Sequence, residues 1–128
     1  MTTIQNIDAA RHDLLVILRH APHGSAWLRE GLEVALVAAA FGKRVALMFQ
    51  ADGVYALMAG QQAGALGQKG THPQIAMLEM YDIETLWVSE EALLQRGLEP
   101  DDLMLPVTLL DSRTLAHVTR ENPYTLVF

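Results

Sequence analysis

The sequence predicts a single three-layer α/β/α domain, in which a mostly parallel, five-stranded sheet carries helices on both faces. Short apolar runs alternate with segments of helical periodicity along the chain, and the connections between most of them are short. No internal repeat or low-complexity tract interrupts this alternation. The 128 residues suffice for one domain with a core and are too few for two. We place the domain at residues 13–128 and expect residues 1–12 to be a flexible N-terminal extension.

The first half predicts two strands around one long helix. Residues 13–20 and 43–49 are continuous apolar runs, as in strands that are covered on both faces. Residues 25–41 have helical periodicity, and Gly42 suits the left-handed residue that ends a helix. The helix carries two apolar stripes, Leu28, Leu32, Ala35 and Ala39 on one side and Trp27, Val34, Ala38 and Phe41 on the other. The second stripe needs a covering surface, either more of the core or another subunit.

The second half continues the alternation. Asp52 is expected to cap a short helix at 53–58, which a Gly-rich loop at 59–70 follows. Thr71 and Gln74 have the spacing of a capping box and predict a helix over about 72–82. Further strands are expected at 84–89, 104–111 and 124–128, and further helices at 90–97 and about 112–121. Ser89 and Gly97 are suited to the two ends of the helix at 90–97.

Composition excludes several classes of function. Nine basic and fifteen acidic residues give a formal charge of -6, which disfavours direct binding of nucleic acid. The start has no apolar signal core, and no apolar run has the length of a membrane span, so we expect a cytoplasmic protein without a membrane partner. The sequence has no cysteine, which excludes disulfides, thiolate metal ligands and cysteine nucleophiles.

Polar residues gather where the predicted strands end. His20, His23, Ser25, Asp52, Ser89 and Asp111 are expected at this one edge of the sheet. A Ser-His-Asp hydrolase is not favoured, because the Gly-x-Ser-x-Gly pattern is absent and each Ser or Asp stands where a helix cap is wanted. The sequence "HAPH" around His20 and His23 offers too few ligands for zinc. Gly24 and its neighbours match no phosphate-loop pattern, so no cofactor is expected, although the helix start can accept an anion.

Several separated motifs resemble one family. "APHGSAWLREGLEVAL", "FQADGVYALMAGQ", "YDIETLWVS" and "LQRGLEP" are similar, in order and spacing, to TusC- or DsrF-like proteins of the DsrE/DsrF/DsrH sulfur-relay group. The likeness covers most of residues 13–100, and the final "YTLVF" agrees with the family's last strand. It implies a DsrEFH-like fold and a heterohexamer with TusB-like and TusD-like subunits. Such a complex passes persulfide sulfur towards 2-thiolation of the wobble uridine of certain tRNAs, whereas a related complex serves sulfur oxidation.

The missing thiol decides the role that we expect within this family. Persulfide transfer needs a thiolate, and the position that matches the active cysteine of the TusD-like subunit is Ser89. The chain is therefore expected to be a non-catalytic structural subunit that touches the tRNA pathway only indirectly. The candidate binding or interface residues are His20, His23, Gly24, Trp27, Asp52, Gly53, Tyr55 and Ser89.

Two alternatives stay open. One is a small α/β enzyme or anion-binding module that uses His23, Asp52 and Ser89 at the strand ends. The other is a stand-alone, homo-oligomeric regulator of the same fold. The sequence does not separate tRNA thiolation from sulfur oxidation.

Overall fold

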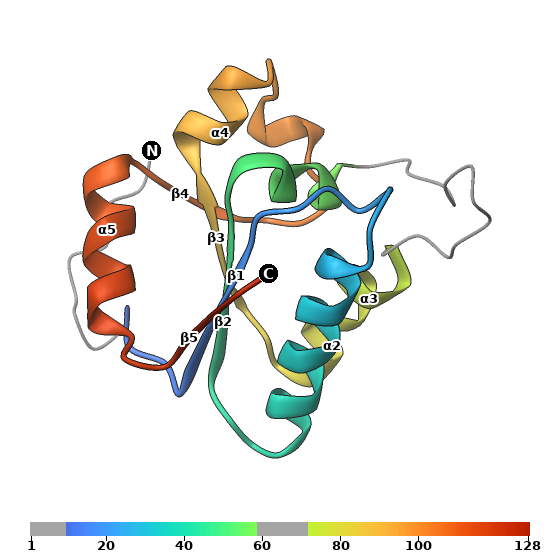
Figure 1. The fold of residues 1–128 in the computed structure, drawn as a ribbon, viewed down its shortest axis with the longest axis vertical. Helices are drawn as coiled ribbons and strands as arrows, with labels where there is room; N and C mark the ends of the chain where they lie inside the picture. The colour runs from blue at the N-terminus through green and yellow to red at the C-terminus, as the bar shows by residue number, and fades with distance from the viewer. Residues whose placement is uncertain (1–9, 59–71) are drawn as a thin grey trace.

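The computed structural model describes residues 10–58 and 72–128, and a five-stranded sheet lies at its centre (Figure 1). The strands are β1 (Leu14–Leu18), β2 (Val45–Phe49), β3 (Thr85–Ser89), β4 (Thr108–Leu110) and β5 (Thr125–Val127). They lie in the order β4-β3-β2-β1-β5, and each neighbouring pair is parallel. The predicted fold class is confirmed.

Helices cover both faces of the sheet. The α-helices are α2 (Trp27–Ala40), α3 (His72–Met77), α4 (Glu90–Gln95) and α5 (Ser112–Glu121), and the 3-10 helices are η1 (Ala51–Leu57), η2 (Glu79–Tyr81) and η3 (Pro100–Asp102). Figure 1 shows α5 on one side of the sheet and α2 and α3 on the other. The strand order explains why helices lie on both faces. Right-handed crossovers from β1 to β4 run across the sheet in one direction, and the return to β5 runs in the other, so the helices of the two parts lie on opposite faces.

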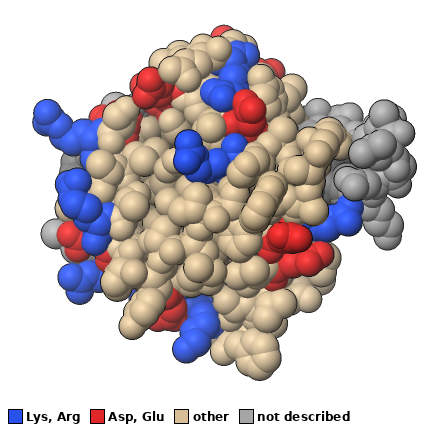
Figure 2. Space-filling model, viewed as in Figure 1, with Lys and Arg blue, Asp and Glu red and all other residues tan. Residues whose placement is uncertain are grey.

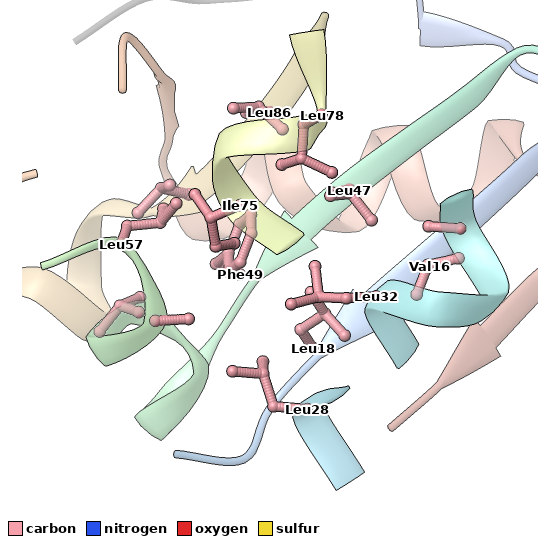
Figure 3. Packing of buried hydrophobic residues seen from close by; sticks show 14 of the residues in the cluster. Val16, Leu18, Leu28, Leu32, Leu47, Phe49, Leu57, Ile75, Leu78 and Leu86 are labelled. Atoms are coloured by element: carbon pink, nitrogen blue, oxygen red, sulfur yellow. The ribbon is translucent and has the colours of Figure 1, made fainter. Parts of the chain in front are cut away.

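The alternating side chains of the strands build two apolar cores. Val16 and Leu18 of β1 point to the α2 side, whereas Leu15 and Ile17 point to the α5 side. The larger core lies under α2 and α3 and joins β1, β2 and β3 to Leu28, Leu32 and Ile75 (Figure 3). The smaller core contains Met48, Trp87, Leu110 and Val118. Because both of their faces are buried, the inner strands β1 and β2 are apolar without interruption, as the sequence predicts.

Several element boundaries differ from the prediction. The helix expected at 25–41 begins at Trp27, and no side chain caps it, so Ser25 is not a cap. The helix expected at 72–82 is α3 followed by η2, and the left-handed Asp82 ends it. Gly42 and Gly97 both have positive φ, at 85° and 66°, as their expected places at helix ends require. The predicted loop at 59–70 and the capping residue Thr71 lie outside the described residues.

The last residues of the segment expected as an extension pack against the domain. Ala10 is buried in the smaller core, and His12 is half-buried. The backbone N–H of His12 donates to Oδ1 of Asn122 at 2.9 Å, and its Nε2 lies 3.1 Å from Oγ1 of Thr85. Residues 10–12 thus pack against the end of α5 and the start of β3, where the polar contacts of His12 hold them. Within the described ranges, the helices lack the combined length and apolarity of a membrane-crossing segment.

Candidate functional site

The carboxyl edge of the sheet, where the parallel strands end, holds most of the candidate residues. Two hollows open there: one of about 570 Å³ beside the ends of β1 and β5, and one of about 310 Å³ beside the ends of β2 and β3. Arg19 and Ala51 line both hollows, so the two adjoin. His20, Trp27 and Asp52 line the first hollow, and Ser89 lines the second. His23 is exposed and lines neither of them.

Ser89 is the N-cap of α4. Its Oγ accepts a hydrogen bond of 3.1 Å from the backbone N–H of Ala92, as predicted. A serine nucleophile needs a neighbouring base to take its proton, and no histidine lines this hollow. Asp111 caps α5 in the same way, at 2.8 Å from the N–H of Thr114. That backbone hydrogen bond is the main reason why the pKa of Asp111 lies below its usual value.

Asp52 is not a helix cap, which corrects the sequence prediction. The N-cap of η1 is Gln50, and Asp52 instead pairs with Arg96 at the end of α4, with Oδ1 2.9 Å from Nη2 and 3.1 Å from Nε. The guanidinium of Arg96 lies 5.9 Å from the centre of the Tyr55 ring. Its Nη1 also donates to the carbonyl of Ala92. Arg96 therefore connects η1 to α4, a role that no local pattern in the sequence indicates.

Gly53 allows η1 to approach the end of β1. A Cβ atom at this position would collide with the carbonyl oxygen of Leu18, which belongs to the backbone and cannot swing away. The same carbonyl accepts a 3.0 Å hydrogen bond from the N–H of Gln50. Ala51, between Gln50 and Gly53, has a φ of 48° and so adopts the left-handed conformation. This segment is therefore constrained by backbone contacts, and Gly53 has a structural role.

His20 and Trp27 contact each other across the turn between β1 and α2. Their rings stack with centroids 5.8 Å apart at an angle of 25°. Gly24 has a φ of 92°, which favours glycine, and no atom lies within 4 Å of where its Cβ would be. No group of three His, Asp or Glu side chains in the described residues is placed to hold a metal ion. The turn shapes a surface, and Trp27, 51% exposed, remains open to contact.

The outer side of α2 and the side of the edge strand β5 that faces α2 carry exposed apolar residues, and we call this surface the α2–β5 face. Its exposed members are Trp27, Val37, Phe41 and Leu126, and half-buried Val34, Ala38 and Phe128 join them. A shallow hollow of about 630 Å³ between Val34, Val37 and Phe128 has Glu30 and Glu33 at its margin. In Figure 2 the middle of the face turned to the viewer is largely uncharged, with most charged side chains towards its margin. The described part of the chain thus covers the second apolar stripe predicted on this helix only in part: Val34 and Ala38 are half-buried, whereas Trp27 and Phe41 are exposed.

The residues of the enzyme or anion-binding alternative do not contact one another through any hydrogen bond or ion pair in the described part of the chain. Asp52 is paired with Arg96, Ser89 accepts from a backbone N–H, and His23 is exposed. At this edge of the sheet, contacts of Arg96 and of Phe128 connect neighbouring helices and strands. The sequence analysis selected neither residue. Arg96 stands in the last turn before Gly97, where a basic residue indicates only a helix end.

The chain is similar to known proteins in sequence and in fold. Residues 12–128 match the family described as DsrE/DsrF-like. A TusC homolog of Vibrio vulnificus is 36% identical over 115 residues, which cover 90% of this chain and 98% of that protein. The intracellular sulfur oxidation protein DsrF of Allochromatium vinosum is 40% identical over 86 residues, covering 67% of this chain and 63% of that one. In fold, the crystal structure of the ychN protein of E. coli matches with a TM-score of 0.74 at 20% identity, over 91% of this chain and 98% of that one.

Proposed function

Because the chain belongs to the DsrE/DsrF-like family, we propose that it is a non-catalytic structural subunit of a sulfur-relay complex. Its relatives include proteins named TusC and a protein named for intracellular sulfur oxidation. The finer form of the proposal is a cytoplasmic, TusBCD-like heterohexamer with TusB-like and TusD-like subunits, which serves 2-thiolation of the tRNA wobble uridine.

The non-catalytic part of this proposal rests on the absence of cysteine from the sequence. In persulfide transfer a thiolate attacks the outer sulfur of the donor, a new S–S bond forms, and the donor sulfur leaves as a thiolate. A serine hydroxyl is not ionised at neutral pH and cannot take this role. Ser89, at the position where the family resemblance expects an active cysteine, uses its oxygen to cap α4. The sulfur must therefore travel on a thiol of a partner subunit.

The α2–β5 face supports the structural part of the proposal. Val37 of α2 is 56% exposed and Phe41, the C-cap of α2, is 81% exposed, although the other side of this helix is buried in the core. The open edge of β5 extends the same surface. We assign this face to a partner subunit of the same fold. Since Glu30 and Glu33 flank its hollow, the matching surface of the partner should carry lysine or arginine opposite them.

Recovery of the native complex tests the proposal. The tagged chain, isolated from its own organism at its normal level, should bring down two relatives of the same fold, one with a cysteine directly after its third strand. Val37→Asp should reduce this recovery by about tenfold or more, because a carboxylate would be buried without a partner in the interface. Leu94→Asp is the matched control, since Leu94 is 71% exposed on α4, away from the α2–β5 face. Recovery of the chain alone, or only with copies of itself, would contradict the proposal and favour the homo-oligomeric regulator.

A further inference from the structure

A further hollow lies at the amino edge of the sheet, on the opposite side from the strand ends discussed above. Its volume is about 830 Å³. Three segments that are distant in sequence converge on it and each contributes a cation: Arg11 before β1, Lys43 in the turn before β2, and Arg120 at the end of α5. Three of the nine lysine and arginine residues thus meet around one hollow of a protein whose formal charge is -6.

Two of these cations are available to a ligand, whereas the acidic side chains of the hollow are already engaged. Glu121 lies 3.6 Å from Arg11, and Asp13 accepts a 2.7 Å hydrogen bond from the backbone N–H of Arg44. Within the described residues, Lys43 and Arg120 make no ion pair. The presence of a cation at Arg120 could be explained by its place at the end of α5, because cations are favoured at helix C-termini. The presence of Lys43 has no such explanation.

Buried contacts hold His12, which lines the hollow, in place. The Nδ2 of Asn122 donates to the carbonyls of Ala10 and Val118, while its Oδ1 accepts from the backbone N–H of His12. The ring of His12 meets that of Trp87 edge to face. Tyr124, at the rim of the hollow, is 70% exposed. The part of the lining that His12 forms is therefore in place before a ligand binds, which lowers the cost of ordering that part of the site.

From this arrangement we infer that the amino-edge hollow docks an acidic segment of a partner protein, whose carboxylates pair with Lys43 and Arg120 and whose apolar side chain rests on Tyr124. Its volume of about 830 Å³ is in the range of compact ligand sites, which suits a few side chains better than a long nucleic-acid strand. The inference does not depend on the sulfur-relay proposal, since it rests on a different surface.

Fluorescence anisotropy with a labelled peptide of several glutamates around one tryptophan tests the site on the full chain. The peptide should bind at low ionic strength and be released as salt is added. Arg120→Glu should weaken binding by about tenfold, since it replaces an attraction by a repulsion. Arg113→Glu is the matched control, because it makes the same charge change at the other end of α5, outside the hollow, and should alter binding by less than about twofold.

Three results would overturn the inference. The first is that the wild-type chain does not bind the peptide. The second is that Arg120→Glu and Arg113→Glu weaken peptide binding equally. The third is that oligouridylate binds as tightly as the peptide, which would indicate a nucleic-acid site. If Arg120→Glu does not fold, as judged by circular dichroism, Lys43→Gln replaces it, because Lys43 is an exposed turn residue. The Lys43→Gln variant should bind the peptide about threefold or more weakly, and an unchanged affinity would count against the site.

Discussion

Replacing Ser89 by alanine tests whether its hydroxyl has a structural or a chemical role. The Oγ of Ser89 is the acceptor for the N–H of Ala92, and α4 is only six residues long, so one cap satisfies a large share of its free N–H groups. Loss of an N-cap typically costs about 1 kcal/mol. Ala92 is buried, and an N–H left without an acceptor there raises the expected cost towards about 2 kcal/mol. For a chain of this size each kcal/mol lowers the melting temperature by about 4 °C.

Urea and thermal unfolding of the Ser89→Ala variant should therefore show a loss of about 1 to 2 kcal/mol and about 4 to 8 °C. Ser112→Ala is the matched control: this exposed hydroxyl donates to Glu91 at 3.2 Å and is expected to contribute less than about 0.5 kcal/mol. Sulfur transfer by the assembled complex should be unchanged in both variants. A folded Ser89→Ala complex that transfers sulfur tenfold more slowly would refute the capping explanation, and so would an unchanged stability.

Three further predictions concern other positions. Gly53→Ala should destabilise the chain by about 3 kcal/mol or more in urea unfolding, because the new methyl group meets the backbone carbonyl of Leu18; a loss below about 1 kcal/mol would contradict that packing. Burial is the main cause that lowers the pKa of His12 below its usual 6.5, so the unfolded chain binds the proton first and stability falls as the pH drops below about 6.5. His12→Gln should flatten this part of the curve of unfolding free energy against pH, and an unaltered slope would be inconsistent with the assignment. Asp52→Asn removes an ion pair with Arg96 in which Asp52 is more than half exposed, so it should cost less than about 1 kcal/mol and leave assembly intact; loss of assembly would indicate a direct role for Asp52 at an interface.

Local signals in the sequence predicted the parts of the fold that depend on neighbouring residues. The strands were predictable because both faces of the sheet are buried and each run is continuously apolar. Ser89 and Asp111 were recognised as caps because each stands directly before its helix. Gly42 and Gly97 were recognised as helix ends because each stands just after its helix.

The incorrect or missing predictions involve partners that are distant in sequence. Asp52 has the residue type of a cap, but the fold brings Arg96 from 44 positions away to pair with it. The contact between His12 and Thr85 spans 73 positions, so no local pattern marks it. Periodicity indicated a second apolar stripe on α2, but it does not distinguish a stripe buried in the core from one left for a partner.

The central claim is that sulfur passes through this complex without being carried by this subunit. The most direct measurement is mass spectrometry of the native complex after it has been loaded with sulfur by a cysteine desulfurase and its carrier, with each subunit checked for added sulfur. The account predicts a persulfide on a cysteine of a partner and unmodified mass for this chain. Stable, transferable sulfur on this chain, isolated without any partner, would contradict it.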